Sequence, residues 1–268
     1  MKYKIIALDI DGTLVSSKHK ILTETREALI KAQEAGLTVV LASGRPTPGM
    51  MPLAKQIKLD EFGGFVLSYN GGRITNVKTG EVIHEVFLAP EEAHEIYEFA
   101  KENNVNIMAY DGGKIMTEDH DEYIQLESDI NAMPLVRVDD FRKAVVKETI
   151  KTLTTGSPET IAEVNKHYIQ KFGDRFSISR SMPFFLEVMP QGTNKAAALE
   201  RVLATLGMRP ADLVACGDGF NDIEMVKYAG LGVAMANGIS EVKAVSDYVT
   251  RANDDNGIVH VLKKFIFP

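Results

Sequence analysis

Cysteine, long apolar runs and clusters of basic residues are scarce in this chain of 268 residues. Cys216 is its single cysteine, which excludes an internal disulfide and a cysteine-based zinc cluster. It ends the apolar run 213–216, so we expect a buried core side chain rather than a catalytic thiol. The short apolar run that ends at Asp9 is not a signal peptide, and no run approaches the length of a membrane span. We therefore expect a cytoplasmic protein.

The charge balance argues against polyanionic partners. Thirty basic and 37 acidic residues give a formal net charge of -7, and no block rich in lysine or arginine occurs. Nucleic acids and anionic membranes are therefore poor candidate partners. The share of hydrophobic residues, 45%, is typical of a globular protein with a substantial core. One large domain, or a core with a smaller inserted domain, would fit this length.

Apolar strands alternate with helices near both ends of the chain. The predicted strands are residues 4–8, 37–42, 65–68, 213–216 and 231–235. The predicted helices are residues 23–35, 194–206, 223–229, 240–245 and 257–265. Continuous apolar strands joined by helices indicate a parallel sheet that is covered on both faces. We therefore predict an α/β fold with a Rossmann-like core.

The middle of the chain has a different pattern, with helices and hairpins. Its predicted strands are residues 82–88, 105–110, 114–118, 151–155, 175–182 and 184–189, and its helices begin at residues 90 and 157. About one hundred residues are enough for a separate domain. We predict a discontinuous core formed by residues 1–83 and 188–268, with a smaller α/β domain inserted at residues 84–187.

Two pairs of aspartates directly follow predicted strands. Asp9 and Asp11 come after the first strand, and Asp218 and Asp222 follow the strand 213–216. Ligands of open parallel sheets bind beyond the carboxyl ends of the strands. Four carboxylates gathered there without a cation would repel one another strongly, so we predict Mg²⁺ between them. Helix capping explains only one acid of the first pair, and the spacing does not fit an EF-hand, because a strand precedes it and the glycine comes too early.

Two further elements could hold an anion. Ser43, Gly44 and Arg45 follow the strand 37–42 and would offer a hydroxyl and backbone N–H groups to a phosphate, although such a triplet is also a common turn. Lys195 lies in the first turn of the helix 194–206, on the same side as its apolar stripe. That position favours a buried lysine over a solvated one.

The order of these motifs resembles that of a known family. DIDGT at 9–13, SGR at 43–45, the lysine at 195 and GDGFND at 217–222 are similar to the four motifs of the haloacid dehalogenase superfamily of Mg²⁺-dependent phosphohydrolases. The α/β insertion resembles the cap of its Cof-type sugar-phosphatase branch. The resemblance extends over essentially the whole chain, including Asn70 and Gly71 and the segment TRANDDNGI at 250–258.

The resemblance implies roles for the acidic residues. Asp9 would be the nucleophile that forms an aspartyl-phosphate, and Asp11 the general acid and then the general base. Mg²⁺ would be held by Asp9, by the backbone carbonyl of Asp11 and by Asp218. Asp222 would orient the waters of the metal or Lys195.

It also implies a set of groups around the phosphate. Lys195 and Ser43 would bind the transferring phosphoryl oxygens, and Lys195 would be part of the catalytic set. The other candidate substrate-binding residues are Gly44, Arg45, Asn70 and Asn221. Two stretches of the cap, residues 111–114 and residues 180–181, could determine specificity or could be plain hairpin turns. The six histidines show no metal-binding spacing.

The motifs are compatible with more than one activity. The resemblance implies a phosphatase acting on small phosphorylated metabolites such as sugar phosphates. We expect the protein to be a monomer or a homodimer. A phosphomutase or phosphotransferase would pass the phosphoryl group of the same aspartyl-phosphate to a second hydroxyl. A regulator that binds a phosphometabolite without turnover would be favoured by the loss of a catalytic position, but none is lost. A dehalogenase of this superfamily does not require an acid at the position of Asp11. The presence of Asp11 therefore argues against dehalogenase activity.

Overall fold

The computed structural model describes residues 2–111 and 113–267, which form two compact units. Residues 1–84 and 194–268 make up the first, here called the core unit, and residues 85–193 make up the second, the inserted unit. Each unit has its own sheet. No helix in the described part of the chain is long and apolar enough to cross a membrane.

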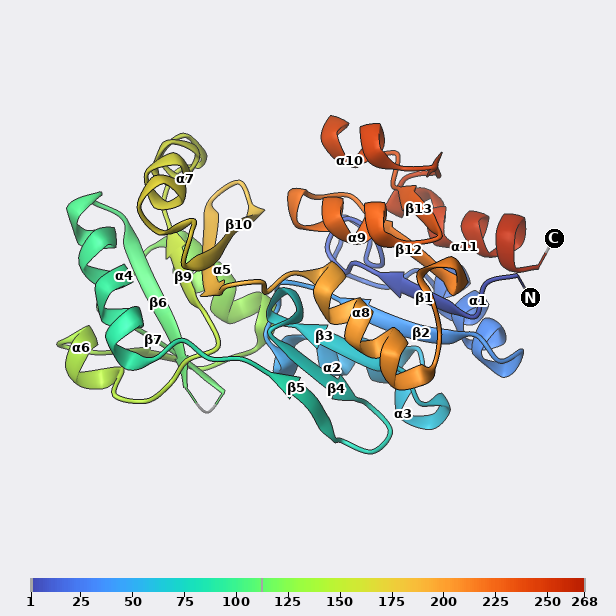
Figure 1. The fold of residues 1–268 in the computed structure, drawn as a ribbon, viewed down its shortest axis with the longest axis horizontal. Coiled ribbons are helices and arrows are strands. Elements are labelled where there is room, and N and C mark those ends of the chain that lie inside the picture. Colours follow the sequence, from blue (N-terminus) through green and yellow to red (C-terminus); the bar gives the residue numbers. More distant parts are fainter. Residues whose placement is uncertain (1, 112, 268) are drawn as a thin grey trace. The chain divides into compact units, whose positions relative to one another are not determined.

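The core unit is built on a mostly parallel sheet (Figure 1). The strand order is β14-β13-β12-β1-β2-β3-β4-β5. The strands are β1 (Ile5–Leu8), β2 (Thr38–Ala42), β3 (Phe65–Ser68), β4 (Arg73–Asn76), β5 (Val82–Glu85), β12 (Leu213–Gly217), β13 (Leu231–Ala234) and β14 (Tyr248–Val249). From β14 to β3 all pairs are parallel, whereas β4 pairs antiparallel with β3. β1 lies between β2 and β12, so the residues that follow these three strands are neighbours.

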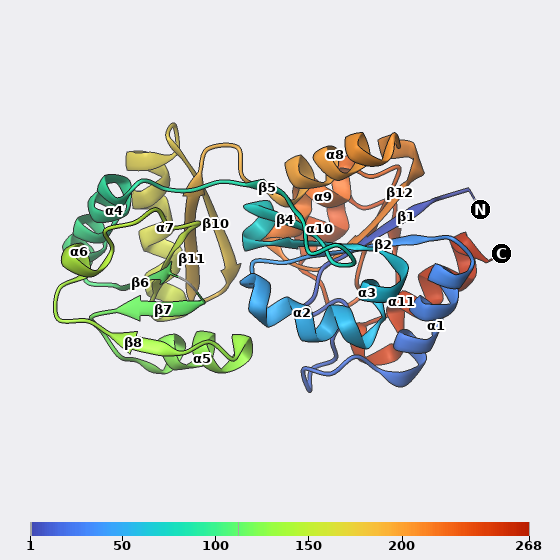
Figure 2. The ribbon, with the colours of Figure 1, turned by 90° about the horizontal axis from the view of Figure 1, so that it is seen from below.

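Helices cover both faces of this sheet, as Figure 2 shows. The helices on one face are α1 (Thr23–Glu34), α2 (Thr47–Gln56), α3 (Leu59–Phe62) and α11 (Gly257–Val261), which a π-helical turn at Leu262–Ile266 extends. The helices on the other face are α8 (Lys195–Leu206), α9 (Ile223–Tyr228) and α10 (Ser240–Val245). Successive strand residues point to opposite faces, so Ile6 packs with the first group and Ile5 with the second. Because both faces are buried, β1 is apolar at every position.

The inserted unit has a sheet of order β10-β11-β9-β6-β7-β8. The strands are β6 (Asn106–Asp111), β7 (Lys114–Thr117), β8 (Leu135–Arg137), β9 (Thr152–Thr155), β10 (Phe176–Met182) and β11 (Phe185–Pro190). The helices are α4 (Pro90–Glu102), α5 (Glu122–Asn131), α6 (Phe141–Ala144) and α7 (Pro158–Phe172). α4 and α7 bury their apolar sides against one face of the sheet, where Ile96 and Ile161 meet Ile107 and Val188.

The C-terminal boundary of the inserted unit differs from the expected one. A boundary between residues 187 and 188 would cut β11, which pairs with both β9 and β10. The unit therefore continues through the end of this strand to Thr193. The N-terminal boundary, expected before residue 84, lies one residue later, between His84 and Glu85.

Candidate active site

The site lies at the carboxyl ends of β1, β2, β3 and β12 in the core unit. Asp9 directly follows β1, and its backbone N–H donates to the carbonyl of Cys216 over 3.0 Å, which continues the pairing with β12. Cys216 is fully buried, as expected for a core side chain. The sheet order thus brings the first aspartate pair next to the second.

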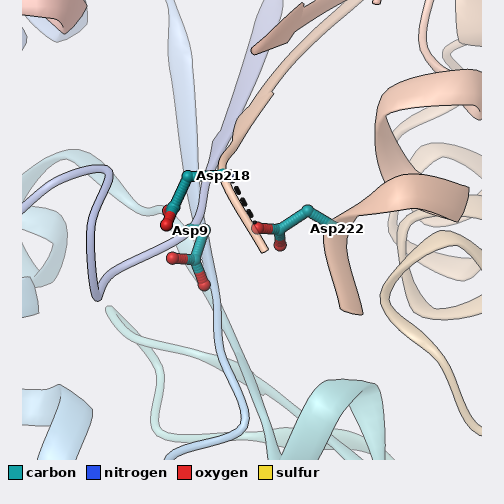
Figure 3. A group of neighbouring side chains, drawn as sticks. All are labelled: Asp9, Asp218 and Asp222. Carbon is teal, nitrogen blue, oxygen red and sulfur yellow. Dashed lines mark hydrogen bonds between the residues drawn. The ribbon is translucent and has the colours of Figure 1, made fainter. Parts of the chain in front are cut away.

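Three carboxylates gather at this edge of the sheet. Figure 3 shows Asp9, Asp218 and Asp222 turned toward a common point, and one carboxylate oxygen of each lies within 4.8 Å of the others. Oδ2 of Asp222 accepts from the backbone N–H groups of Asp218 and Gly219, each over 2.9 Å. Thr13 donates its hydroxyl to Oδ1 of Asp218 over 2.7 Å. These contacts determine the orientation of two of the three acids.

Lys195 is the cation within this acidic group. It begins α8 directly after Asn194, whose side chain caps the helix by accepting from the N–H of Ala197. Its ammonium group is buried and donates to Oδ1 of Asp9 and to Oδ1 of Asp222, each over 2.6 Å. The lysine therefore lies on the buried side of its helix and joins two of the acids.

The pKa values reflect this crowding. Burial and the charge of Asp222 raise the pKa of Asp9 well above its usual value, although Lys195 opposes the shift. The same two causes raise the pKa of Asp218 to about 7. Burial alone would lower the pKa of Lys195, but the charges of Asp222 and Asp9 outweigh it and raise the pKa above its usual value. When all three acids are ionised, their negative charge exceeds what the lysine alone compensates, so the pKa values of Asp9 and Asp218 rise.

The residues present fit a divalent cation. A cluster of carboxylate oxygens at a strand end is the donor set that Mg²⁺ prefers, since the ion keeps several waters and takes one or two carboxylates. Asp9 and Asp218 are better placed to bind it than Asp222, because both oxygens of Asp222 already accept hydrogen bonds. The hydrogen bonds that Asp222 already accepts are compatible with the predicted role of Asp222 in orienting its neighbours.

Asp11 differs from the other acids. Its carboxylate lies outside the group of three and receives two hydrogen bonds from Arg45, from Nε over 2.7 Å and from Nη2 over 2.6 Å. In this structure the guanidinium of Arg45 faces Asp11, and the expected role of Arg45 in substrate binding stays a prediction. A metal contact of Asp11 would have to come from its backbone carbonyl, because the side chain is held by Arg45.

The other candidate substrate-binding residues lie side by side. Ser43 is buried, its hydroxyl accepts from the N–H of Arg45, and its carbonyl accepts from the N–H of Asn70. Asn221 donates its side-chain amide to Oδ1 of Asn70 over 2.9 Å. Gly44 is buried between Ser43 and Arg45. The loops after β2, β3 and β12 are therefore linked to one another around the acids.

A glycine allows the first loop to approach the acids closely. Gly12 has a φ of +84°, and a Cβ there would lie 2.3 Å from Oδ2 of Asp218. A larger residue would be strained by its backbone conformation and would also displace this carboxylate. The DIDGT motif thus requires its glycine because of the acid that follows β12.

Two asparagines that were not predicted as site residues hold this first loop in place. Asn237 donates its side chain to the carbonyl of Gly12, and Asn253 donates to that of Val15, each over 2.8 Å. Asn253 also donates its N–H to the side chain of Asn237 over 3.0 Å. The only available signal was the segment 250–258, to which sequence alone assigned no role.

Comparisons with known proteins agree with this geometry. The sequence model of the haloacid dehalogenase-like hydrolases matches residues 6–262. The chain belongs to this family. Within it the chain falls in the Cof-type branch, and it is a hydrolase of the phosphatase class.

Relatives and solved structures match almost the whole chain. The 5-amino-6-(5-phospho-D-ribitylamino)uracil phosphatase YcsE of Bacillus subtilis is 30% identical, over 98% of this chain and 96% of the relative. A haloacid dehalogenase-like hydrolase from Bacteroides thetaiotaomicron is 42% identical, with a TM-score of 0.89 over 98% of this chain and 99% of its own. The HAD subclass IIB sugar phosphatase BT4131 is 28% identical, with a TM-score of 0.84 over 99% of this chain and 100% of its own.

The two cap stretches that could determine specificity in this haloacid dehalogenase-like hydrolase lie in the inserted unit. Asp111 and Lys114 pair across the turn between β6 and β7, and Gly112 lies outside the described residues. Arg180 lies in β10 and donates to the carbonyl of Pro183 over 2.9 Å, within its own hairpin. These contacts are those of hairpin turns, and a role in specificity stays a prediction.

Proposed function

We propose that this phosphatase hydrolyses phosphate monoesters of small metabolites, sugar phosphates foremost, through an aspartyl-phosphate on Asp9. The observation that supports the proposal most directly is the position of the Asp9 carboxylate. It lies at a strand end, 2.6 Å from the ammonium group of Lys195 and within a cluster suited to Mg²⁺. The similarity to a sugar phosphatase favours that substrate class.

In the first step an oxygen of Asp9 attacks phosphorus, and the bond from phosphorus to the leaving oxygen breaks. Asp11 gives a proton to that oxygen, so the product leaves as a neutral alcohol. Lys195 holds Asp9 in place and reduces the repulsion between this carboxylate and the anionic substrate. Asp9, Asp218 and the backbone carbonyl of Asp11 would hold Mg²⁺, which would supply further positive charge to the site when bound.

In the second step water attacks the phosphorus of the aspartyl-phosphate. Asp11, now a carboxylate, takes a proton from the water, and the bond between phosphorus and the Asp9 oxygen breaks. Inorganic phosphate is released and both aspartates return to their initial state. Ser43, buried at the end of β2, is the hydroxyl that we assign to a phosphoryl oxygen.

Phosphate release from a panel of sugar phosphates, nucleotides and 4-nitrophenyl phosphate tests this proposal. Wild type would be compared with Asp9→Asn, and with Asp60→Asn as a control at an exposed position of α3. We expect release with Mg²⁺ that EDTA and Asp9→Asn abolish and Asp60→Asn leaves unchanged. Release that survives in a pure Asp9→Asn protein would remove Asp9 from the mechanism. An aspartyl-phosphate that forms but transfers to a second sugar hydroxyl would instead identify a mutase.

A further inference from the structure

The two aspartates of the DIDGT motif contact different cations. Asp9 faces Lys195, which belongs to α8, whereas Asp11 faces Arg45, which follows β2. The residues are only two apart in sequence, yet their carboxylates are held by different elements, the helix α8 and the loop after β2. Asp11 is therefore kept apart from the acidic cluster by a specific contact.

The backbone of Arg45 is itself well anchored. Its N–H donates to the hydroxyl of Ser43 over 3.2 Å, and its carbonyl accepts from the N–H of Tyr69 over 3.0 Å. Its side chain is only 10% exposed, whereas that of Asp11 is 24% exposed. The arginine is thus the more buried of the two and its backbone is anchored, so it can orient its partner.

The contact also determines the orientation of the carboxylate. Nε and Nη2 of Arg45 each bind a different oxygen of Asp11, at 2.7 Å and 2.6 Å. Two parallel hydrogen bonds from a planar guanidinium restrict rotation of the carboxylate as well as its position. A lysine would supply the charge but not this restriction. His19 lies 4.0 Å from Oδ1 of Asp11 and is exposed, so it adds little orientation.

We propose that Arg45 is a positioning residue for Asp11 rather than a ligand of the substrate phosphate. The inference rests on the proposed function, in which Asp11 protonates the leaving oxygen and later takes a proton from water. Proton transfer requires the oxygen of the acid to lie within hydrogen-bond reach of the leaving oxygen. Arg45 keeps the carboxylate in the rotation that this requires, and a misplaced group loses rate even when it is present.

The proposal predicts a dependence on the leaving group. A sugar alkoxide is a poor leaving group and needs a proton from Asp11, whereas 4-nitrophenolate leaves without one. The value of kcat/KM includes only the steps up to the first irreversible one, here the formation of the aspartyl-phosphate. Loss of Arg45 should therefore lower kcat/KM for a sugar phosphate much more than for 4-nitrophenyl phosphate.

The experiment compares these two kcat/KM values in Arg45→Gln and Arg45→Lys, using the sugar phosphate that the wild type hydrolyses fastest. We expect both variants to lower the ratio of sugar phosphate to aryl phosphate by about 10-fold to 100-fold, within the range of a lost general-acid contribution. The ratio is measured on one preparation, so it does not depend on the fraction of protein that is folded. Arg26→Gln, at an exposed position of α1, is the control and should leave the ratio unchanged.

Equal losses on both substrates would overturn the proposal, because a phosphate ligand acts on every phosphate ester alike. So would an unchanged ratio in Arg45→Lys, which would show that charge rather than orientation is what matters. A double-mutant cycle completes the test: in the background of Asp11→Asn, Arg45→Gln should have no further effect on the ratio. If Asp11→Asn itself leaves the ratio unchanged, the proposed role of Asp11 fails. If only Arg45→Gln leaves it unchanged, the positioning role alone fails.

Discussion

Lys195 Nζ lies 2.6 Å from Oδ1 of Asp9, although 186 residues separate the two in sequence. The same ammonium group lies 2.6 Å from Oδ1 of Asp222, so one buried lysine neutralises part of a crowded acidic cluster. A buried charge is stable only when it is paired and hydrogen-bonded. The pair therefore serves the fold as well as the site, and removing the lysine should affect both.

Lys195→Met should lower activity and stability together. The methionine has a similar shape but leaves Asp9 and Asp222 without their shared cation. Breaking a buried ion pair from one side costs about 3 kcal/mol in the free energy of unfolding. We also expect kcat to fall by about 100-fold or more, since the charge that stabilises the transition state is lost. Urea denaturation and phosphate release would measure the two effects.

Lys227→Met is the matched control for this change. Lys227 lies in α9, its side chain is 50% exposed, and it pairs with Glu224 on the same helix. Exposed ion pairs of this kind contribute little to the free energy of unfolding. A Lys195→Met protein that behaved like Lys227→Met in both assays would contradict the role assigned to Lys195.

Mg²⁺ should stabilise the protein more at pH 8 than at pH 5. In the folded protein without metal the pKa of Asp218 is raised to about 7 and that of Asp9 is also raised, so folding favours their protonated forms. The contribution of these two acids to the stability of the metal-free protein should therefore fall as pH rises from about 4 to 7, because over this range they bind more protons in the folded state than in the unfolded state. Metal binding requires the carboxylates to be deprotonated, so its contribution grows over the same range.

Thermal unfolding at several pH values, with Mg²⁺ or with EDTA, measures this effect. We expect the increase in Tm caused by Mg²⁺ to be small at pH 5 and to reach a plateau near pH 8. Asp218→Asn should remove most of the increase, because it deletes one of the carboxylates. A Mg²⁺ effect independent of pH, or one that Asp218→Asn leaves intact, would argue that the ion binds elsewhere.

Gly12→Ala should inactivate the enzyme, whereas Gly36→Ala should not. Both glycines have a positive φ, +84° and +95°, so both substitutions carry a backbone cost of about 1 kcal/mol. Only at Gly12 would the new Cβ meet Asp218, whereas nothing lies within 4 Å of a Cβ at Gly36. Tm would measure the backbone cost that both variants share, and phosphate release would measure the effect of the contact with Asp218, which only Gly12→Ala makes. Similar activity in both variants would show that the approach of Gly12 to Asp218 is unimportant.

Asn237→Ala should lower activity although the residue is exposed. Its side chain supports the carbonyl of Gly12 and accepts from the N–H of Asn253, so its loss loosens the loop that carries Asp11. We expect kcat to fall about 10-fold, because a looser loop would displace Asp11 from the position that proton transfer requires. Gln170→Ala, at an exposed position of α7, is the control amide. Equal activities in the two variants would exclude a supporting role for Asn237.

Local patterns in the sequence were enough to predict most of the elements that carry the site. The strands β1, β2, β3 and β12 are buried on both faces, so they are continuous apolar runs that end at polar residues. α2 was not predicted, because its sequence contains Pro48 and Pro52, which usually end a helix rather than lie within one. The short β4 and β14 and the helix α5 were missed too, since few residues of each show a clear periodicity.

The order of residues along the chain is enough to predict that acids follow two apolar strands and that a lysine begins the helix α8 on its buried side. The pairing of each acid with its cation, with Lys195 between Asp9 and Asp222 and Arg45 on Asp11, becomes apparent only once the chain is folded. These pairings depend on the order β12-β1-β2 in the sheet and on the return of α8 to the sheet after the inserted unit. Long-range packing determines which residues at the ends of different strands become neighbours. The periodicity of a segment indicates only which of its own sides is buried.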